Sequence, residues 1–364
     1  MSLKLNSERI IYYDFIRAFA IFGVVACHCF APLVTNVNIF GTKLWYYALF
    51  LNSLRDISVP LFVLVSGALL ITKKDSVTFF IKKRLKKVIV PYIFWIVIFL
   101  IFMISYFHYE NPILFILKTL SIPPIGKGIA FWFVQMIILI YIIIIILNKL
   151  QEHNKVFLKI GLIISIIFLF LLNFNIIPTY PMPFNYIYFS AYAIFGYYLS
   201  SYDFSNNKIL KSFNITNEKL CIIFFALSVI LYLFEIYFNA SNSLLLNKHS
   251  AVSQFGFLNV FLVISIFLFF RYFTQSKGKF NKICNYITKN KIGEFIFSVS
   301  FCSYGIYLCH LIILNFMRNS LSFMEDITST SFYYSLILIL TLIISWLIIL
   351  AMDKVPVLKY FSGK

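Results

Sequence analysis

Residues 9–31 of the chain read RIIYYDFIRAFAIFGVVACHCFA. From Ile10 to Ala31 this stretch is almost entirely apolar, and it is long enough to cross the ~30 Å hydrocarbon core of a bilayer as a helix. Its apolar residues follow one another instead of alternating with polar ones, which argues against a strand of a membrane barrel. Because lipid offers no partner for backbone amides, a helix is the structure that remains. The stretch therefore predicts a transmembrane helix.

Nine more apolar stretches follow the first. They are Leu44–Ile71, Val88–Phe107, Phe131–Leu147, Phe157–Leu172, Phe184–Leu199, Leu220–Phe238, Phe255–Phe273, Phe295–Met317 and Phe332–Met352. Only 12% of the residues are charged, against roughly 25% in soluble domains, so most of the exterior must face lipid. We expect an all-α, polytopic integral membrane protein with about ten transmembrane helices, built as a single domain over residues 1–364. Pro60 predicts a kink or a break in the second helix.

The net charge of +18 follows the segments between the predicted helices. If the N-terminus is cytoplasmic, 24 Lys and Arg residues fall in cytoplasmic segments and five in external ones. This asymmetry is what orients a membrane protein, so it explains the positive charge without a nucleic-acid partner. It predicts that both termini of this multi-pass protein are cytoplasmic.

The first predicted helix carries three polar residues that lipid would penalise: Asp14, Arg17 and His28. Arg17 and His28 are eleven residues apart, which places them on one face of a helix about 16 Å apart along its axis. Asp14 can pair with Arg17 at the i,i+3 spacing, and we interpret it as a structural ion pair. For Arg17 and His28 we favour function over a packing role.

Other ionisable residues lie inside predicted helices. Arg55, with Asp56 beside it, falls near the middle of the second, Glu235 in the seventh, and His310 in the ninth. His310 and His28 reach a similar predicted depth, which favours a shared polar cavity, although a lone membrane histidine is often a helix-packing residue.

Two alternatives weaken the functional interpretation of such residues. Tyr232 or Tyr237 could simply satisfy Glu235 by hydrogen bonding. The sequence Cys27-His28-Cys29 resembles a metal site, but consecutive helical residues point about 100° apart, so we predict no metal there.

A basic cluster, KKRLKK at residues 82–87, precedes the third helix. Much of this charge must serve orientation and contact with anionic lipids. Arg84 and Lys87 lie one helical turn apart and could also hold phosphate groups.

Several stretches together resemble the acyltransferase 3 family of membrane-bound acyltransferases, in particular its branch that O-acetylates surface polysaccharides. The first helix is similar to the family's Arg-x10-His motif at Arg17 and His28. RDISVPLFVLVSGALL resembles its second-helix signature at Ser66 and Gly67, with Arg55 as in that branch.

The resemblance continues along the chain. RLKKVIVPYIFW is similar to the family's R-x2-R-x3-P pattern, except that Lys87 stands where a second Arg is usual. AFWFVQMIILIYI resembles the Trp-Phe element at Trp132, and two later helices match at Gly196, Tyr307 and His310.

This resemblance implies an enzyme that takes an acyl group from cytoplasmic acyl-CoA and passes it to a cell-surface or lipid-linked glycan. We expect acetyl-CoA as a co-substrate and no permanently bound cofactor. Some members carry an extracytoplasmic SGNH hydrolase-like domain, which we expect this chain to lack. A sugar hydroxyl needs a general base with a pKa near 7, which suits His28 as base or transient acyl carrier. Arg17 would stabilise oxyanion charge.

We assign the remaining candidates to the two ends of this reaction. Arg84, Lys87 and Trp132 are predicted on the donor side. The residues predicted on the acceptor side or in the cavity are Arg55, Ser66, Gly67, Glu235, Tyr307 and His310. The alternative is a transporter or flippase of a glycan or small metabolite, which would need the same intramembrane charges. Hydrolysis of acetyl-CoA by the purified protein would separate the two.

Overall fold

A computed structural model describes residues 9–71, 76–107, 131–174, 176, 184–204, 212–251 and 253–364. The described residues form helices and turns and contain no strand, so the predicted all-α class is confirmed. Nine helical segments among them are long and apolar enough to cross a membrane, which makes the chain a multi-pass membrane protein. The chain divides into two compact units: residues 1–69 with 195–301, and residues 70–194 with 302–364.

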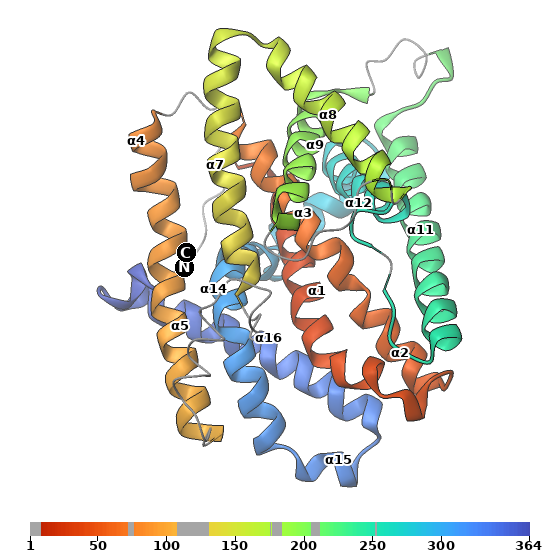
Figure 1. Ribbon diagram of the computed structural model, residues 1–364, viewed down its shortest axis with the longest axis vertical. Helices are drawn as coiled ribbons and strands as arrows, with labels where there is room; N and C mark the ends of the chain where they lie inside the picture. The colour runs from red at the N-terminus through yellow and green to blue at the C-terminus, as the bar shows by residue number, and fades with distance from the viewer. Residues whose placement is uncertain are drawn as a thin grey trace. The chain divides into compact units, whose positions relative to one another are not determined.

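The first unit is built around α1 (Ile11–Thr35). α1 packs against α2 (Lys43–Asn52) and α12 (Phe257–Gln275), and α11 (Asn217–Leu246) packs along α12 and against α2 (Figure 1). α3 (Leu54–Leu70), α9 (Ser190–Ser201) and α14 (Lys291–Ser320) each contribute one part to this unit, and α13 (Lys279–Lys289) completes it. Large buried side chains such as Trp45, Phe267 and Tyr272 fill its interior.

Two close approaches explain small residues in this unit. A Cβ at Gly196 of α9 would collide with the backbone of Leu64 in α3, and a Cβ at Gly23 of α1 would collide with the Ser58 hydroxyl. Glycine therefore lets these backbones come together, as small residues commonly do between membrane helices. The match at Gly196 is thus a packing requirement.

The second unit contains α5 (Lys86–Phe107), α7 (Trp132–His153), α8 (Val156–Asn173) and α16 (Thr330–Lys354), with the other parts of α3, α9 and α14. Shorter elements are α4 (Val77–Phe80), the π-helix η2 (Ile81–Leu85), the 3₁₀ helices η3 (Phe184–Phe189) and η5 (Leu358–Tyr360), and α15 (Phe323–Ile327). The C-terminal segment packs against α5, where the Trp95 indole donates to the Phe361 carbonyl at 3.0 Å.

Three predicted boundaries differ from the structure. The second predicted helix is interrupted at Ser53, between α2 and α3, whereas Pro60 lies inside α3. The segment predicted as a cytoplasmic loop at 73–87 is helical from Val77, because the Ser76 hydroxyl accepts a hydrogen bond from the amide of Phe79 and caps α4. Residues 72–75 lie outside the described part of the chain.

The third difference concerns the span predicted at 184–199. It consists of the 3₁₀ helix η3 followed by α9, which has only 12 residues and is about 18 Å long, shorter than a bilayer core. Pro181 and Pro183 stand just before it in the sequence, and each removes a backbone donor that a longer α-helix would need.

Arg271 lies within α12, inside the span predicted at 255–273, and is 5% exposed. Its guanidinium donates to the carbonyls of Leu199 and Tyr202, at the end of α9. Its role in the structure is to join these two helix ends.

Candidate active site in the first helical unit

The two predicted catalytic residues interrupt a buried helix face. Most side chains of α1 from Tyr12 to Phe30 are buried, whereas Arg17 and His28 are partly exposed. The neighbouring Cys27 and Cys29 are both buried, so they point away from His28. Among the described residues, no group of three His, Cys, Asp or Glu side chains is placed to hold a metal ion.

Asp14 makes the structural contacts of α1. Its carboxylate accepts from Arg9 Nε at 2.6 Å and from the Ser300 hydroxyl at 2.7 Å, and the Arg9 guanidinium lies over the ring of Phe297. The ion pair that the structure shows at Asp14 therefore involves Arg9, five residues earlier, whereas the sequence suggested Arg17. Asp14 is 7% exposed and joins α1 to α14 within this unit.

The predicted residues on α3 share one face. Arg55 and Ser66 are eleven residues apart, the same spacing as Arg17 and His28 on α1, and Phe62 lies between them on that face. All three are partly exposed, while the α3 residues around them are mostly buried. Gly67, beside Ser66, is buried. α3 thus carries a partly exposed stripe with a cation at one end and a hydroxyl at the other, whereas on α1 Arg17 and His28 are partly exposed at two separate places, with Ile21 and Val24 buried between them.

Proline shapes the backbone at these residues. A proline cannot donate to the carbonyl four residues earlier, and its ring pushes that carbonyl outward. Pro32 has this relation to His28 in α1, and Pro60 has it to Asp56 in α3.

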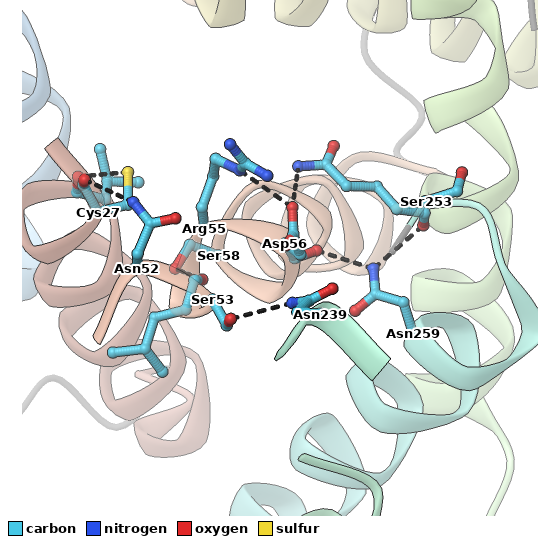
Figure 2. Close-up of polar contacts among 12 residues, drawn as sticks. Cys27, Asn52, Ser53, Arg55, Asp56, Ser58, Asn239, Ser253 and Asn259 are labelled. Carbon is cyan, nitrogen blue, oxygen red and sulfur yellow. Dashed lines mark hydrogen bonds and ion pairs between the residues drawn. The ribbon is translucent and has the colours of Figure 1, made fainter. Parts of the chain in front are cut away.

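Asparagine side chains donate to backbone carbonyls at both places, and at Pro60 the asparagine replaces the lost helical donor. Asn259 Nδ2 donates to the backbone oxygen of Asp56 at 2.8 Å, the carbonyl that Pro60 leaves without a helical donor. Asn52 Nδ2 donates to the backbone oxygen of Cys27 at 2.9 Å, directly before His28 (Figure 2). Buried amides therefore stabilise both helices next to the candidate residues.

Asp56 is the centre of a polar cluster (Figure 2). Its Oδ1 accepts from Arg55 Nε at 3.1 Å and from Gln254 Nε2 at 3.3 Å. The Asp56 side chain is 2% exposed, whereas that of Arg55 is 40% exposed, so the guanidinium reaches out of the cluster. A neighbouring contact joins Asn239 Nδ2 to the Ser53 hydroxyl at 3.0 Å.

Glu235 lies in α11 with its side chain fully buried, and neither of its oxygens has a hydrogen-bond partner. The two tyrosines that might have satisfied it do not. The Tyr232 hydroxyl donates to the carbonyl of Phe50, and Tyr237 is 63% exposed. The alternative in which these tyrosines satisfy Glu235 is therefore wrong. Asp56 and Arg55 are the charged groups that act on Glu235.

The other predicted residues lie in the second unit. Trp132 begins α7, where its ring stacks near Tyr186 with centroids 6.2 Å apart. His310 of α14 is fully buried, and its Nδ1 lies 2.6 Å from the backbone oxygen of Tyr307, whose ring contacts Phe133. The shared cavity predicted for His28 and His310 stays a prediction, because they belong to different units.

The two predicted donor-side cations also belong to the second unit. Arg84 is half-buried in the π-helix η2, and Lys87 is exposed at the start of α5. Pro91 stands four residues after Lys87, as Pro32 and Pro60 stand after His28 and Asp56. The Tyr304 hydroxyl donates at 2.7 Å to the adjacent carbonyl of Val88.

The sequence analysis missed the amide residues of the cluster: Asn52, Asn239, Gln254 and Asn259. The sequence did contain a signal for the asparagines, because an asparagine in an apolar helix must find a hydrogen-bond partner or pay the free-energy cost of burying an unpaired polar group, as a charged residue does. The candidates chosen from the sequence were mainly ionisable residues.

Similarity to a known family indicates the function of this chain. No curated protein and no solved structure gives a significant match. A family model described as an acyltransferase domain matches residues 10–350, which include every candidate residue above. The chain therefore belongs to the acyltransferase 3 family and is a multi-pass membrane acyltransferase.

Proposed function

We propose that the enzyme moves an acyl group, with acetyl as the first choice, from cytoplasmic acyl-CoA to a hydroxyl of a cell-surface or lipid-linked glycan. In this proposal the protein lies in the bacterial cell membrane with both termini cytoplasmic. The observation that supports the site is that Arg17, His28, Arg55 and Ser66 are all partly exposed on mostly buried helices of one unit.

The groups of this site account for the proton transfers and for the bonds formed and broken in the reaction. His28 takes the proton of the acceptor hydroxyl, whose oxygen attacks the thioester carbonyl. The new C–O bond forms as the C–S bond breaks, and the CoA thiolate takes the proton back from the imidazolium. In the two-step form, an imidazole nitrogen of His28 carries the acyl group between donor and acceptor. Arg17 stabilises the oxyanion, since a cation in a low-dielectric site acts strongly on developing charge.

The remaining candidate residues are assigned to the donor and acceptor ends in this proposal. Arg84 and Lys87 bind CoA phosphates at the cytoplasmic mouth, with Trp132 on the same side, and the polar groups around Arg55 and Glu235 receive the acceptor. Tyr307 and His310 shape the acceptor end. Lys87 offers a point charge where Arg would offer a planar fork, so it contributes charge more than bidentate recognition.

The test is release of free CoA thiol from acetyl-CoA by the purified protein, with and without glycan acceptor. An acyltransferase of this kind releases thiol slowly without acceptor and faster with it. A transporter leaves acetyl-CoA intact under both conditions. Absence of thiol release from the parent protein, in detergent and in reconstituted membranes, would contradict the proposal.

A further inference from the structure

The polar cluster around Asp56 contains a surplus of buried acceptors that no donor of the described residues reaches. Asn259 Nδ2 binds the carbonyls of Asp56 and Gln254, and the Tyr232 hydroxyl binds Phe50. Arg55 Nε binds Asp56 Oδ1, while the partly exposed Arg55 side chain reaches out of the cluster. The acceptors left over are Asp56 Oδ2, Asn259 Oδ1 and both oxygens of Glu235, all buried without a hydrogen-bond partner. Buried polar atoms are rarely left in this state, so the surplus calls for a ligand that brings donors.

A histidine outside the predicted set lies at the edge of this cluster. His249 lies in the connection between α11 and α12, half-buried, and its Nδ1 is also buried without a hydrogen-bond partner. The charges of Arg55 and Asp56 act on it. Burial, helped by the charge of Arg55, lowers the pKa of His249, so its imidazole is neutral near pH 7 and one ring nitrogen can accept a hydrogen bond.

The connection holds His249 in place through its two neighbours. The fully buried hydroxyl of Ser243 accepts from the amide of Ser250 at 2.9 Å and donates to the Ser250 carbonyl at 3.2 Å. The amide of Lys248 donates to the Ser243 carbonyl at 3.1 Å. Because the backbones of both residues that flank His249 form hydrogen bonds with Ser243, the backbone at His249 is held in place.

The cluster also adjoins the candidate catalytic residue. Asn52, the last residue of α2, donates to the carbonyl of Cys27, next to His28 in α1. Arg55 and Asp56 both act electrostatically on Cys27. The cluster therefore adjoins α1 at Cys27, the residue before His28, and all of these residues belong to the first unit.

We propose that Asp56, Glu235, Asn259 and His249 form the subsite that binds the hydroxyls of a neutral sugar ring, with His249 as a positioning residue at its entrance. This rests on the proposed function, which it deepens by assigning the acceptor to named groups. A sugar fits because each hydroxyl both donates and accepts, so it can satisfy Glu235 in either protonation state. A metal cation fits less well, because the Arg55 charge opposes it and the described residues offer no three-ligand group.

The first test measures binding without catalysis. The protein is purified in a detergent without a sugar headgroup. Its melting temperature is measured with each of a panel of methyl glycosides. In a second series it is measured with NaCl, and with choline chloride as the control for ionic strength. We expect at least one glycoside to raise the melting temperature of the parent, because a ligand that binds only the folded state stabilises it. Glu235→Gln and His249→Ala should need roughly tenfold more glycoside for the same rise, as expected when a hydrogen bond of about 1.4 kcal/mol is lost.

Matched controls come from the same elements. Lys248→Ala removes the exposed neighbour of His249, and Tyr237→Phe alters an exposed residue of α11. Both should respond to glycoside as the parent does. Stabilisation by Na⁺ but by no glycoside, or no response of the parent to any glycoside, would overturn the sugar subsite.

The second test separates this inference from the proposed function. With a glycoside from the first test as acceptor, His249→Ala and Glu235→Gln should raise the KM for acceptor about tenfold without a matching rise in the KM for acetyl-CoA. A purely structural effect would lower kcat and folded yield instead. If the parent releases thiol but acceptor KM is the same in both variants, the subsite is wrong. If the parent binds glycoside but never releases thiol, the proposed function is wrong and the binding site stands.

Discussion

Single residues of the first unit carry the chemistry that we assign to the protein. Two buried carboxylates among them differ in whether they have hydrogen-bond partners. Asp14 is fully engaged by Arg9 and Ser300, which is the pattern of a structural carboxylate. Glu235 is equally buried but has no hydrogen-bond partner on either oxygen. Because an unsatisfied buried acceptor is costly, the lack of a hydrogen-bond partner points to a ligand more strongly than burial alone does.

The catalytic assignment predicts the behaviour of α1 variants. His28→Ala should abolish acyl transfer, and His28→Gln should be equally inactive, because an amide keeps a hydrogen bond but cannot act as a base. Membrane insertion should be retained, since removing an imidazole from an apolar helix favours insertion. The measurement is thiol release at matched protein level. Near-normal activity of both variants would move the base elsewhere, with His310 as the next candidate.

A related prediction concerns Arg17. Arg17→Lys should lower kcat severely, because an ammonium provides a point charge in place of a planar guanidinium. Arg9→Lys is the matched control: it keeps a cation beside Asp14 and lies outside the proposed reaction. Equal loss in the two variants would show that a general need for charge near α1, and not Arg17 itself, limits the rate.

At the scale of the element, proline explains the place of one buried amide, Asn259, beside the candidate residues. Pro32 and Pro60 each stand four residues after a candidate polar residue, and Pro91 stands four residues after Lys87. In a membrane the freed carbonyl needs another donor, because lipid has none. At Asp56 that donor is Asn259, from a helix 203 residues away in sequence.

This pairing can be tested by rescue. Asn259→Ala should destabilise the protein by about 1–3 kcal/mol, because the Asp56 carbonyl loses its donor. Adding Pro60→Ala should recover part of the loss, since Ala at 60 has an N–H that can donate within the helix. Thermal unfolding in detergent is the measurement. Asn239→Ala, which removes a donor to Ser53, is the control that Pro60→Ala should not rescue.

The basic element η2–α5 gives a prediction for the donor. Replacing Arg84 and Lys87 together with Ala should raise the KM for acetyl-CoA, because these groups are proposed to contact its phosphates. Salt should weaken donor binding more in the parent than in the variant. Lys83→Ala is the control, since its ammonium lies over the ring of Phe79. An unchanged KM and salt response would leave the cluster with an orientation role alone.

At the scale of the whole molecule, the asymmetry of Lys and Arg predicts which side each connection faces. A cysteine placed at Lys83 should resist a membrane-impermeant thiol reagent in intact cells, whereas one at Lys248 should react. Lys248 is preferred to Asn247, which ends α11 in the left-handed conformation at φ 45°. The six native cysteines are all buried, so background labelling should be low. The opposite labelling pattern would exchange the proposed donor and acceptor faces.

The sequence by itself determined the helical class, most of the spans and the candidates on α1. These are local properties: apolar length sets a span, and the 3.6-residue repeat places Arg17 and His28 on one face. The tertiary structure alone decided that Arg9 pairs with Asp14, that neither tyrosine satisfies Glu235, and that Asn259 replaces the donor lost at Pro60. These outcomes depend on contacts between distant segments, and composition and periodicity carry no information about which distant helices meet. For the same reason the sequence did not single out His249. A histidine in a connection between apolar spans carries no free-energy penalty for membrane insertion, and only the fold buries it beside Arg55 and Asp56.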